Sequence, residues 1–267
     1  MYLKFLLITF IVHSSCLNLL DICQSGIRDD GINYVHCARK SLTEIPRFSS
    51  NRLFNLAFDE LILSDNLITH IHANVFNGLR IKRLIMSGNH IKSIDESAFR
   101  ELENYLEEII LEFDSTIVDK IPQAIQTNLI NIKSLTLIGL NLRILSSNIF
   151  SQMKKLESLT LKSYLSYNYL KKLLLINMNN LQILNLQNNL LTSENIYGSI
   201  PKQLKELTLD FNSINIINKN FITENNSLEI LSLQSNEFLL TKSNVFQHLN
   251  KLKKLNLARN NIQIIPK

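Results

Sequence analysis

Apolar and polar residues alternate along the chain in one recurring order, L-x-x-L-x-L-x-x-N-x-L, which fits nine consecutive segments. In the first segment the order runs through Phe58, Leu61, Leu63, Asn66 and Ile68. The position of the asparagine is taken in turn by Asn66, Asn89, Asp114, Leu140, Tyr164, Asn189, Asn212, Asn236 and Asn260. Successive positions lie 23 to 26 residues apart. Such near-constant spacing indicates a tandem repeat.

Each repeat predicts one β-strand followed by a returning segment. The x-L-x-L-x centre has a period of two, which is typical of a strand with one buried face. No single repeat can bury this face alone, so the repeats must stack into a solenoid. The asparagine amide can donate to and accept from backbone groups where the strand ends, so we expect stacked asparagines to form a hydrogen-bonded ladder along the solenoid. We therefore expect an α/β solenoid with a parallel sheet on its concave face and a mostly irregular or short-helical convex side.

The returning segments carry a second pattern. A phenylalanine follows the asparagine position by ten residues in four repeats, and Phe221 follows by nine. These residues, expected to stack as an aromatic spine on the convex side, are Phe76, Phe99, Phe150 and Phe246. The middle repeats depart from the pattern, because Asp114, Leu140 and Tyr164 replace asparagine. We expect the middle section to be the weakest and to show the fastest hydrogen exchange.

The ends of the chain suggest the domain organisation. Residues 1–16 read as a secretory signal, with Lys4 before an apolar run of eight residues; the alternative is an apolar first strand. Cys16 would leave with this segment. Cys23 and Cys37 would then remain, and we expect them to form one disulfide; the alternative is two buried thiols. No later segment is apolar over a length that could span a membrane.

The cysteine-containing lead-in and the segment Ser41–Pro46 (SLTEIP) resemble the N-terminal cap of extracellular leucine-rich-repeat proteins. Slit, chaoptin, Toll-like receptors and small proteoglycans carry repeats of this type. The resemblance extends over about residues 21–267 and implies a horseshoe that binds other proteins. We expect a cap at 17–46, and about nine repeats at 47–267 without a C-terminal cap. Asn225 begins a glycosylation sequon.

The composition gives little support to other chemistry. The net charge is only +5 and the basic residues are scattered, which argues against nucleic-acid binding. His70 and His72 flank Ile71 and are expected to diverge, so we expect no metal site. No Ser/His/Asp set or glycine-rich phosphate loop is apparent, and we expect neither a cofactor nor enzymatic activity. The alternative is a catalytic site assembled across several repeats.

The concave face is the expected binding surface, because parallel strands side by side form an extended platform. Ile62, Ile85 and Ile110 would form an exposed apolar ladder there, either as a contact patch or simply through β-propensity. Glu60, Arg83 and Glu108 alternate in sign, as cross-strand pairs do. The residues expected to contact a ligand are Ile62, Ile85, Ile110, Glu108, Glu112, Phe113, Lys162, Asn185, Gln187, Asp210, Phe211 and Gln234.

The sequence as a whole favours a secreted, non-catalytic protein-binding module whose protein partner it does not identify. One alternative is the ectodomain of a leucine-rich-repeat receptor. Another is the non-catalytic subunit of a secreted enzyme, a role to which the resemblance also points. The last repeat, with Leu252, Leu255 and Leu257, has no following layer. Such an edge favours end-to-end self-association.

Overall fold

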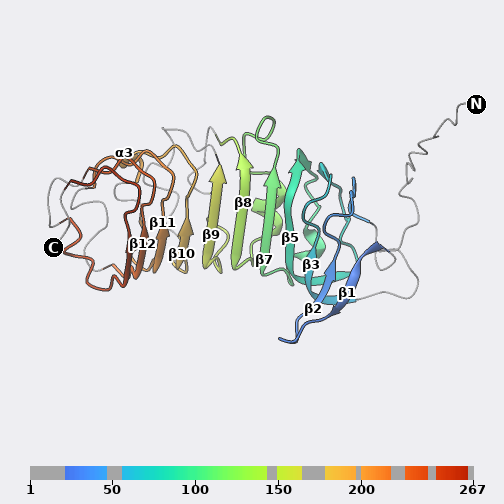
Figure 1. Cartoon of the computed structure of the whole chain (residues 1–267). Coiled ribbons are helices and arrows are strands. Elements are labelled where there is room, and N and C mark those ends of the chain that lie inside the picture. Colours follow the sequence, from blue (N-terminus) through green and yellow to red (C-terminus); the bar gives the residue numbers. More distant parts are fainter. Residues whose placement is uncertain are drawn as a thin grey trace, which may run out of the picture.

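The computed structural model describes residues 22–46, 56–142, 149–163, 178–196, 200–217, 226–239 and 245–263. Its main feature is one sheet of eleven strands, ordered β1-β2-β3-β5-β7-β8-β9-β10-β11-β12-β13. The strands stand side by side in the order of the sequence (Figure 1). From β2 onward every neighbouring pair is parallel, and only β1 runs antiparallel to β2.

Each predicted repeat contributes one strand to this sheet. The strands are β1 (Gln24–Ile27), β2 (Asn33–His36), β3 (Leu56–Ile62), β5 (Leu79–Ile91), β7 (Glu108–Phe113), β8 (Ser134–Leu140), β9 (Ser158–Ser163), β10 (Ile183–Asn185), β11 (Glu206–Thr208), β12 (Ile230–Ser232) and β13 (Lys254–Asn256). The remaining elements are β4 (His70–Ile71), β6 (Ser93–Ile94), the 3-10 helix η1 (Arg100–Leu102), α2 (Gln123–Asn128) and α3 (Ser193–Ile196). The predicted parallel-sheet solenoid with little helix is therefore confirmed.

The core is a stack of aliphatic side chains from successive strands. Leu61 pairs in register with Leu84, which pairs with Ile109, and all three are fully buried. The same column continues through Leu135, Leu159, Leu184, Leu207 and Leu231, all at 0% exposure. Burying a leucine or isoleucine side chain contributes roughly 1.5–3 kcal/mol. Because each layer covers the next, this stabilisation is shared between neighbouring repeats.

The aromatic spine is only partly formed in the residues that the structure describes. The Phe76 and Phe99 rings stack with their centroids 5.9 Å apart and their planes 15° apart. Phe150 is buried, while Phe246 meets Phe238, edge to face, at 6.3 Å. Phe221 lies outside the described residues.

Asparagine amides, buried except at half-buried Asn260, connect six of the repeats to the turn before them. Asn212 Nδ2 donates to the carbonyl oxygens of Leu209 in its own repeat, at 2.9 Å, and Leu186 in the preceding one, at 3.0 Å. Its Oδ1 accepts from the Leu191 amide at 3.0 Å. The asparagines that link two repeats in this way are Asn66, Asn89, Asn189, Asn212, Asn236 and Asn260. This is the predicted asparagine ladder.

A left-handed backbone residue precedes each of these asparagines. The residues in this conformation are Asp65, Gly88, Asn188, Phe211, Ser235 and Arg259, with φ between 54° and 69°. At Gly88 a Cβ would collide with the Asp65 side chain and lie 3.0 Å from the Asp65 amide nitrogen. Glycine is therefore required at that position, where φ is also positive.

The ladder is interrupted in the middle repeats, but backbone pairing takes its place. Leu140 is fully buried, and Asp114 Oδ1 accepts locally from Thr116 instead. Here the strands are longer, with six residues in β7, seven in β8 and six in β9, against three each in β10 to β13. Glu112 pairs with Ile138, which pairs with Lys162. The expected interruption at Asp114 and Leu140 is thus confirmed. The expected weakness of these repeats stays a prediction, against which their backbone pairing argues; strands of this length also occur with asparagine, in β3 and β5. Tyr164 lies outside the described residues.

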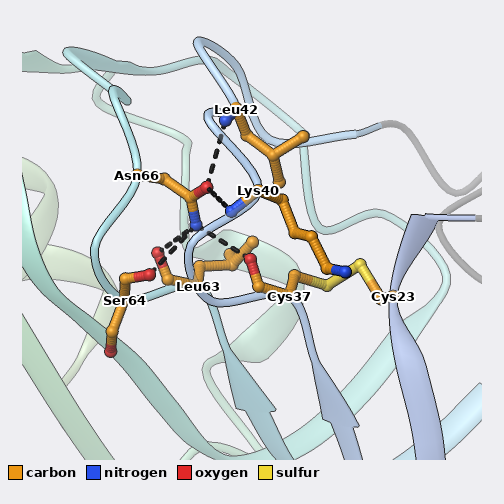
Figure 2. Close-up of a disulfide and its surroundings, with 7 residues drawn as sticks. All are labelled: Cys23, Cys37, Lys40, Leu42, Leu63, Ser64 and Asn66. Carbon is orange, nitrogen blue, oxygen red and sulfur yellow. Dashed lines mark hydrogen bonds between the residues drawn. A yellow bond between two sulfur atoms is a disulfide. The ribbon is translucent and has the colours of Figure 1, made fainter.

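The N-terminal cap is fastened to the first repeat by a covalent bond and by the first asparagine. Figure 2 shows the predicted disulfide between Cys23 and Cys37, with their Cα atoms 4.6 Å apart. Asn66 donates to the Cys37 carbonyl at 2.9 Å and accepts from the amides of Lys40 and Leu42, each at 3.0 Å.

Two other observations concern the chain ends and membranes. In the described part of the chain, no helix has the length and apolar character needed to cross a membrane. The expected signal segment 1–16 and Asn225 lie outside the described residues.

We predict that Asn212→Ala lowers the free energy of unfolding by about 1–3 kcal/mol, because it leaves buried carbonyls without a donor. Asn185→Ala is the matched control: Asn185 is half-buried, and its side chain accepts from the Gln187 amide two residues away. The control should change the free energy by less than about 0.5 kcal/mol. Urea denaturation of both variants measures the difference. Equal effects would contradict a structural role for the ladder.

Candidate functional site

The outer sheet face is the set of side chains that alternate with the buried column on β2 to β13. Ile62, Ile85 and Ile110 lie directly beside one another in this face, since the pairing aligns all three. Each is half-buried. The column continues across the sheet through Thr136, Thr160, Asn185, Thr208, Ser232 and Asn256. Within this column the apolar residues are thus confined to the strands nearest the cap, whereas neighbouring columns of the same face also hold Ile138, Ile183 and Ile230 on later strands.

A chain of ion pairs runs beside the isoleucines. Arg83 Nε lies 2.8 Å from Glu108 Oε2, and Arg83 Nη1 lies 3.4 Å from Glu60 Oε1. Arg28 from the cap approaches Glu60 Oε2 to 2.5 Å, and Glu60 is only 2% exposed. The hydrogen bond with Glu108 and its negative charge raise the pKa of the Arg83 guanidinium. The predicted alternation of Glu60, Arg83 and Glu108 is confirmed, and it fixes these side chains next to the apolar ladder.

The expectation that Phe113 contacts a ligand is wrong. Phe113 is 2% exposed and belongs to the core, so its ring is closed to a ligand. Phe211 occupies the corresponding position of a later repeat, directly before Asn212. It has a φ of 56° and is 45% exposed. The difference arises because β7 continues in extended form as far as Phe113, which therefore alternates inward after Glu112. At Phe211 the strand has already ended, and the left-handed residue directs its ring outward.

The polar candidates form a second region near the other end of the sheet. Asp210 Oδ1 accepts from the Ser232 hydroxyl at 2.6 Å and from the Gln234 amide at 2.8 Å. Asn256 Nδ2 donates to Gln234 Oε1 at 3.0 Å. Asn185 accepts from the Gln187 amide at 3.0 Å. These side chains are held in place by one another, beside the exposed Phe211 ring.

Glu112 and Lys162 lie between the two regions and are separated by Ile138 of β8. Glu112 Oε2 instead accepts from the Gly88 amide at 2.7 Å. The twelve expected contact residues are therefore spread over most of the sheet, with an apolar region over β3 to β7 and a polar region over β10 to β12.

Sequence reasoning missed a charged row at the starts of the strands. Lys82 Nζ lies 2.7 Å from Asp59 Oδ1, Lys133 Nζ 3.1 Å from Glu107 Oε2, and Lys253 Nζ 2.7 Å from Glu229 Oε2. These residues occupy the position just before the outward-facing Glu60 column. The row was detectable in the sequence, because charges of opposite sign alternate at this repeat position except at Gln182. Its residues are Asp59, Lys82, Glu107, Lys133, Glu157, Gln182, Lys205, Glu229 and Lys253. Opposite charges on neighbouring strands favour this register.

Ion pairing shifts the pKa values of several members of this row. The hydrogen bond from Lys82 lowers the pKa of Asp59 and, reciprocally, raises that of Lys82. The hydrogen bond from Lys253 lowers the pKa of Glu229. Lys82 is exposed and Asp59 and Glu229 are half-buried, so salt partly screens their interactions.

The two histidines of the sequence THIHA converge, which corrects the expectation that they diverge. Residues i and i+2 of a strand point to the same side, and His70 begins β4. Their ring centroids lie 4.3 Å apart at 62°. His70 Nε2 also lies 3.1 Å from Asp95 Oδ1.

Comparison with known proteins identifies the class. A family described as BspA type leucine rich repeat region matches in six copies, over residues 39–139 and 69–199. The two ranges together span more than half of the chain. The chain belongs to this family of leucine-rich-repeat proteins. No curated protein matches it significantly. The leucine-rich-repeat part of the resemblance is thereby confirmed.

The charged row predicts a specific pH dependence. The lowered pKa values of Asp59 and Glu229 give stability above their ordinary values near 3.8 and 4.5, which is lost as the pH falls through the lowered values. The raised pKa of Lys82 gives stability below its ordinary 10.5, which is lost as the pH rises through the raised value.

We therefore predict that Asp59→Asn makes the rise of unfolding free energy with pH shallower between about pH 2 and 5. Glu237→Gln is the control, since the described residues provide no ion pair for this exposed carboxylate. Thermal unfolding at low ionic strength across this range measures the slope. An unchanged slope in Asp59→Asn would show that the pairing with Lys82 contributes nothing.

Proposed function

We propose that this protein is a secreted, non-catalytic module that binds another protein through the outer sheet face. Leucine-rich repeats generally serve as protein-binding repeats, and this supports the binding role at the level of the class. The observation that carries the proposal is the apolar ladder of Ile62, Ile85 and Ile110, aligned on three adjacent strands beside fixed ion pairs.

The physical argument rests on preorganisation. The ladder is attached to strands whose inner side chains are fully buried, so a partner would not need to order the backbone. Apolar side chains surrounded by satisfied charges are typical of the centre and rim of an interface. Simple β-propensity remains the alternative, because isoleucine is favoured in any strand. The two explanations differ in whether replacing one isoleucine affects a partner.

Secretion is part of the proposal and has separate support. A Cys23–Cys37 disulfide persists in oxidising compartments and is rare in the cytosol. The signal-like sequence at 1–16 points to the same destination. A curved horseshoe of the Slit, chaoptin or Toll-like-receptor type, with the sheet on its concave side, belongs to the same proposal. So does a glycan on Asn225.

Two related roles remain open within this class: the ectodomain of a receptor, and the non-catalytic subunit of a secreted enzyme. The absence of catalytic activity and of a cofactor remains a prediction. End-to-end self-association also remains a prediction.

The test is capture of partners from extracellular fluid of the source, using the purified chain as bait and mass spectrometry as readout. We predict that Ile85→Glu reduces recovery of specific partners by at least about tenfold, as expected for a residue at an interface centre. Thr208→Glu is the matched control, because it introduces the same charge in the same column on β11.

Circular dichroism should first show that both variants fold. If Thr208→Glu reduces the recovery of partners as strongly as Ile85→Glu does, the effect is a general effect of charge. That result would contradict the proposed contact patch. If neither variant changes the recovery of partners, the binding surface does not include the isoleucines.

A further inference from the structure

A cluster of histidine and carboxylate side chains lies outside the main sheet, where the chain turns back after two successive asparagines. Strands β4 and β6 pair there in parallel, with His70 beside Ser93 and Ile71 beside Ile94. Ile71 is fully buried and anchors the short strand to the core. His70 and His72 consequently project on the opposite side, toward Asp95 of the next repeat.

The three side chains already converge on one point. His70 Nε2 lies 3.1 Å from Asp95 Oδ1, and one ligand atom from each of His70, His72 and Asp95 lies within 4.8 Å of the other two. His72 is exposed, and the other two are half-buried. We propose that His70, His72 and Asp95 form a binding site for a divalent transition-metal ion, with Zn²⁺ as the expected ion and water completing the coordination.

The donor set suits zinc. Two imidazoles and one carboxylate are common protein ligands of Zn²⁺, and three protein ligands leave one position of a tetrahedron open. Metal–ligand distances of about 2.1 Å place the ligand atoms of a tetrahedron about 3.4 Å apart. The His70–Asp95 distance of 3.1 Å is already close to this value. The other separations between ligand atoms, all within 4.8 Å, can close toward this value by rotation of the exposed His72 side chain.

Partners behind the ligands hold two of them in position. Asp95 Oδ2 accepts from the Ala73 amide at 2.8 Å, so the carboxylate is oriented by the backbone while Oδ1 faces His70. His70 Nδ1 is hydrogen-bonded to the Ser93 hydroxyl, which leaves Nε2 directed at the site. Second-shell bonds of this kind fix the ring orientation of metal-binding histidines and align ligating carboxylates.

The site joins two neighbouring repeats, because the histidines follow Asn66 and the aspartate follows Asn89. A bound ion would therefore act as a staple between them, in addition to the asparagine ladder. Since the ion binds only where the repeats are stacked, it should raise the unfolding temperature, and the rise should grow with the logarithm of the zinc concentration once that concentration exceeds the dissociation constant.

The experiment is isothermal titration of the purified, chelator-treated full chain with ZnCl₂, accompanied by thermal unfolding with and without zinc. We expect one high-affinity Zn²⁺ per chain, and a zinc-dependent rise in the unfolding temperature. His72→Gln should weaken the binding by at least about tenfold and abolish the thermal shift. Because His72 is exposed, this variant tests the ligand without disturbing the core.

Asp95→Asn provides a second test, since an amide oxygen can still accept from the Ala73 amide but lacks the negative charge. His36→Gln is the matched control, because His36 lies on β2 in the main sheet and should leave zinc binding unchanged. No zinc uptake by the wild-type chain at millimolar zinc would overturn the proposal. The proposal would also be overturned if His72→Gln and Asp95→Asn both bound zinc with the affinity of the wild-type chain.

Discussion

The structure depends on one constraint: wherever a strand ends inside the solenoid, its buried backbone groups must find hydrogen-bond partners. In most repeats a single asparagine amide satisfies it. Asn212, for example, bridges the carbonyls of Leu209 and Leu186 and accepts from the Leu191 amide. The amide therefore ends one strand, begins the return and attaches the repeat to its neighbour. The leucine stack provides the driving force, while the amide determines where each turn is made.

The same constraint explains where the functional side chains lie. In the asparagine repeats from β10 onward the strands are short, and a left-handed residue such as Phe211 presents its side chain to solvent. In the middle repeats the backbone of the neighbouring strand replaces the amide, the strands continue, and Phe113 turns into the core. The central column of the outer sheet face changes from isoleucines near the cap to polar residues beyond it, while the alternating charges just before the Glu60 column help to maintain the register on both sides of Gln182.

Much of this was predictable from spacing alone. The repeat, the strand positions, the asparagine ladder and the Cys23–Cys37 disulfide all follow from periodicity and cysteine counting. The burial of Phe113 did not, because a repeat template assigns the same direction to each position, whereas the direction depends on whether asparagine or another residue, here Asp114, follows. The convergence of His70 and His72 was missed although the signal was present: two residues apart in a strand, they share a side. The approach of Asp95 required the stacking of two repeats, which the sequence of either repeat alone does not specify.

The central claim is that backbone pairing between β7, β8 and β9 fully replaces the missing asparagines. Native-state hydrogen exchange, followed by mass spectrometry, tests it most directly. The account predicts that peptides covering 108–140 exchange as slowly as those containing the amides bound to asparagine side chains, such as Leu191 and Ile214. Markedly faster exchange over 108–140 than in the asparagine repeats would show that the amide, and not the paired backbone, is what stabilises each turn.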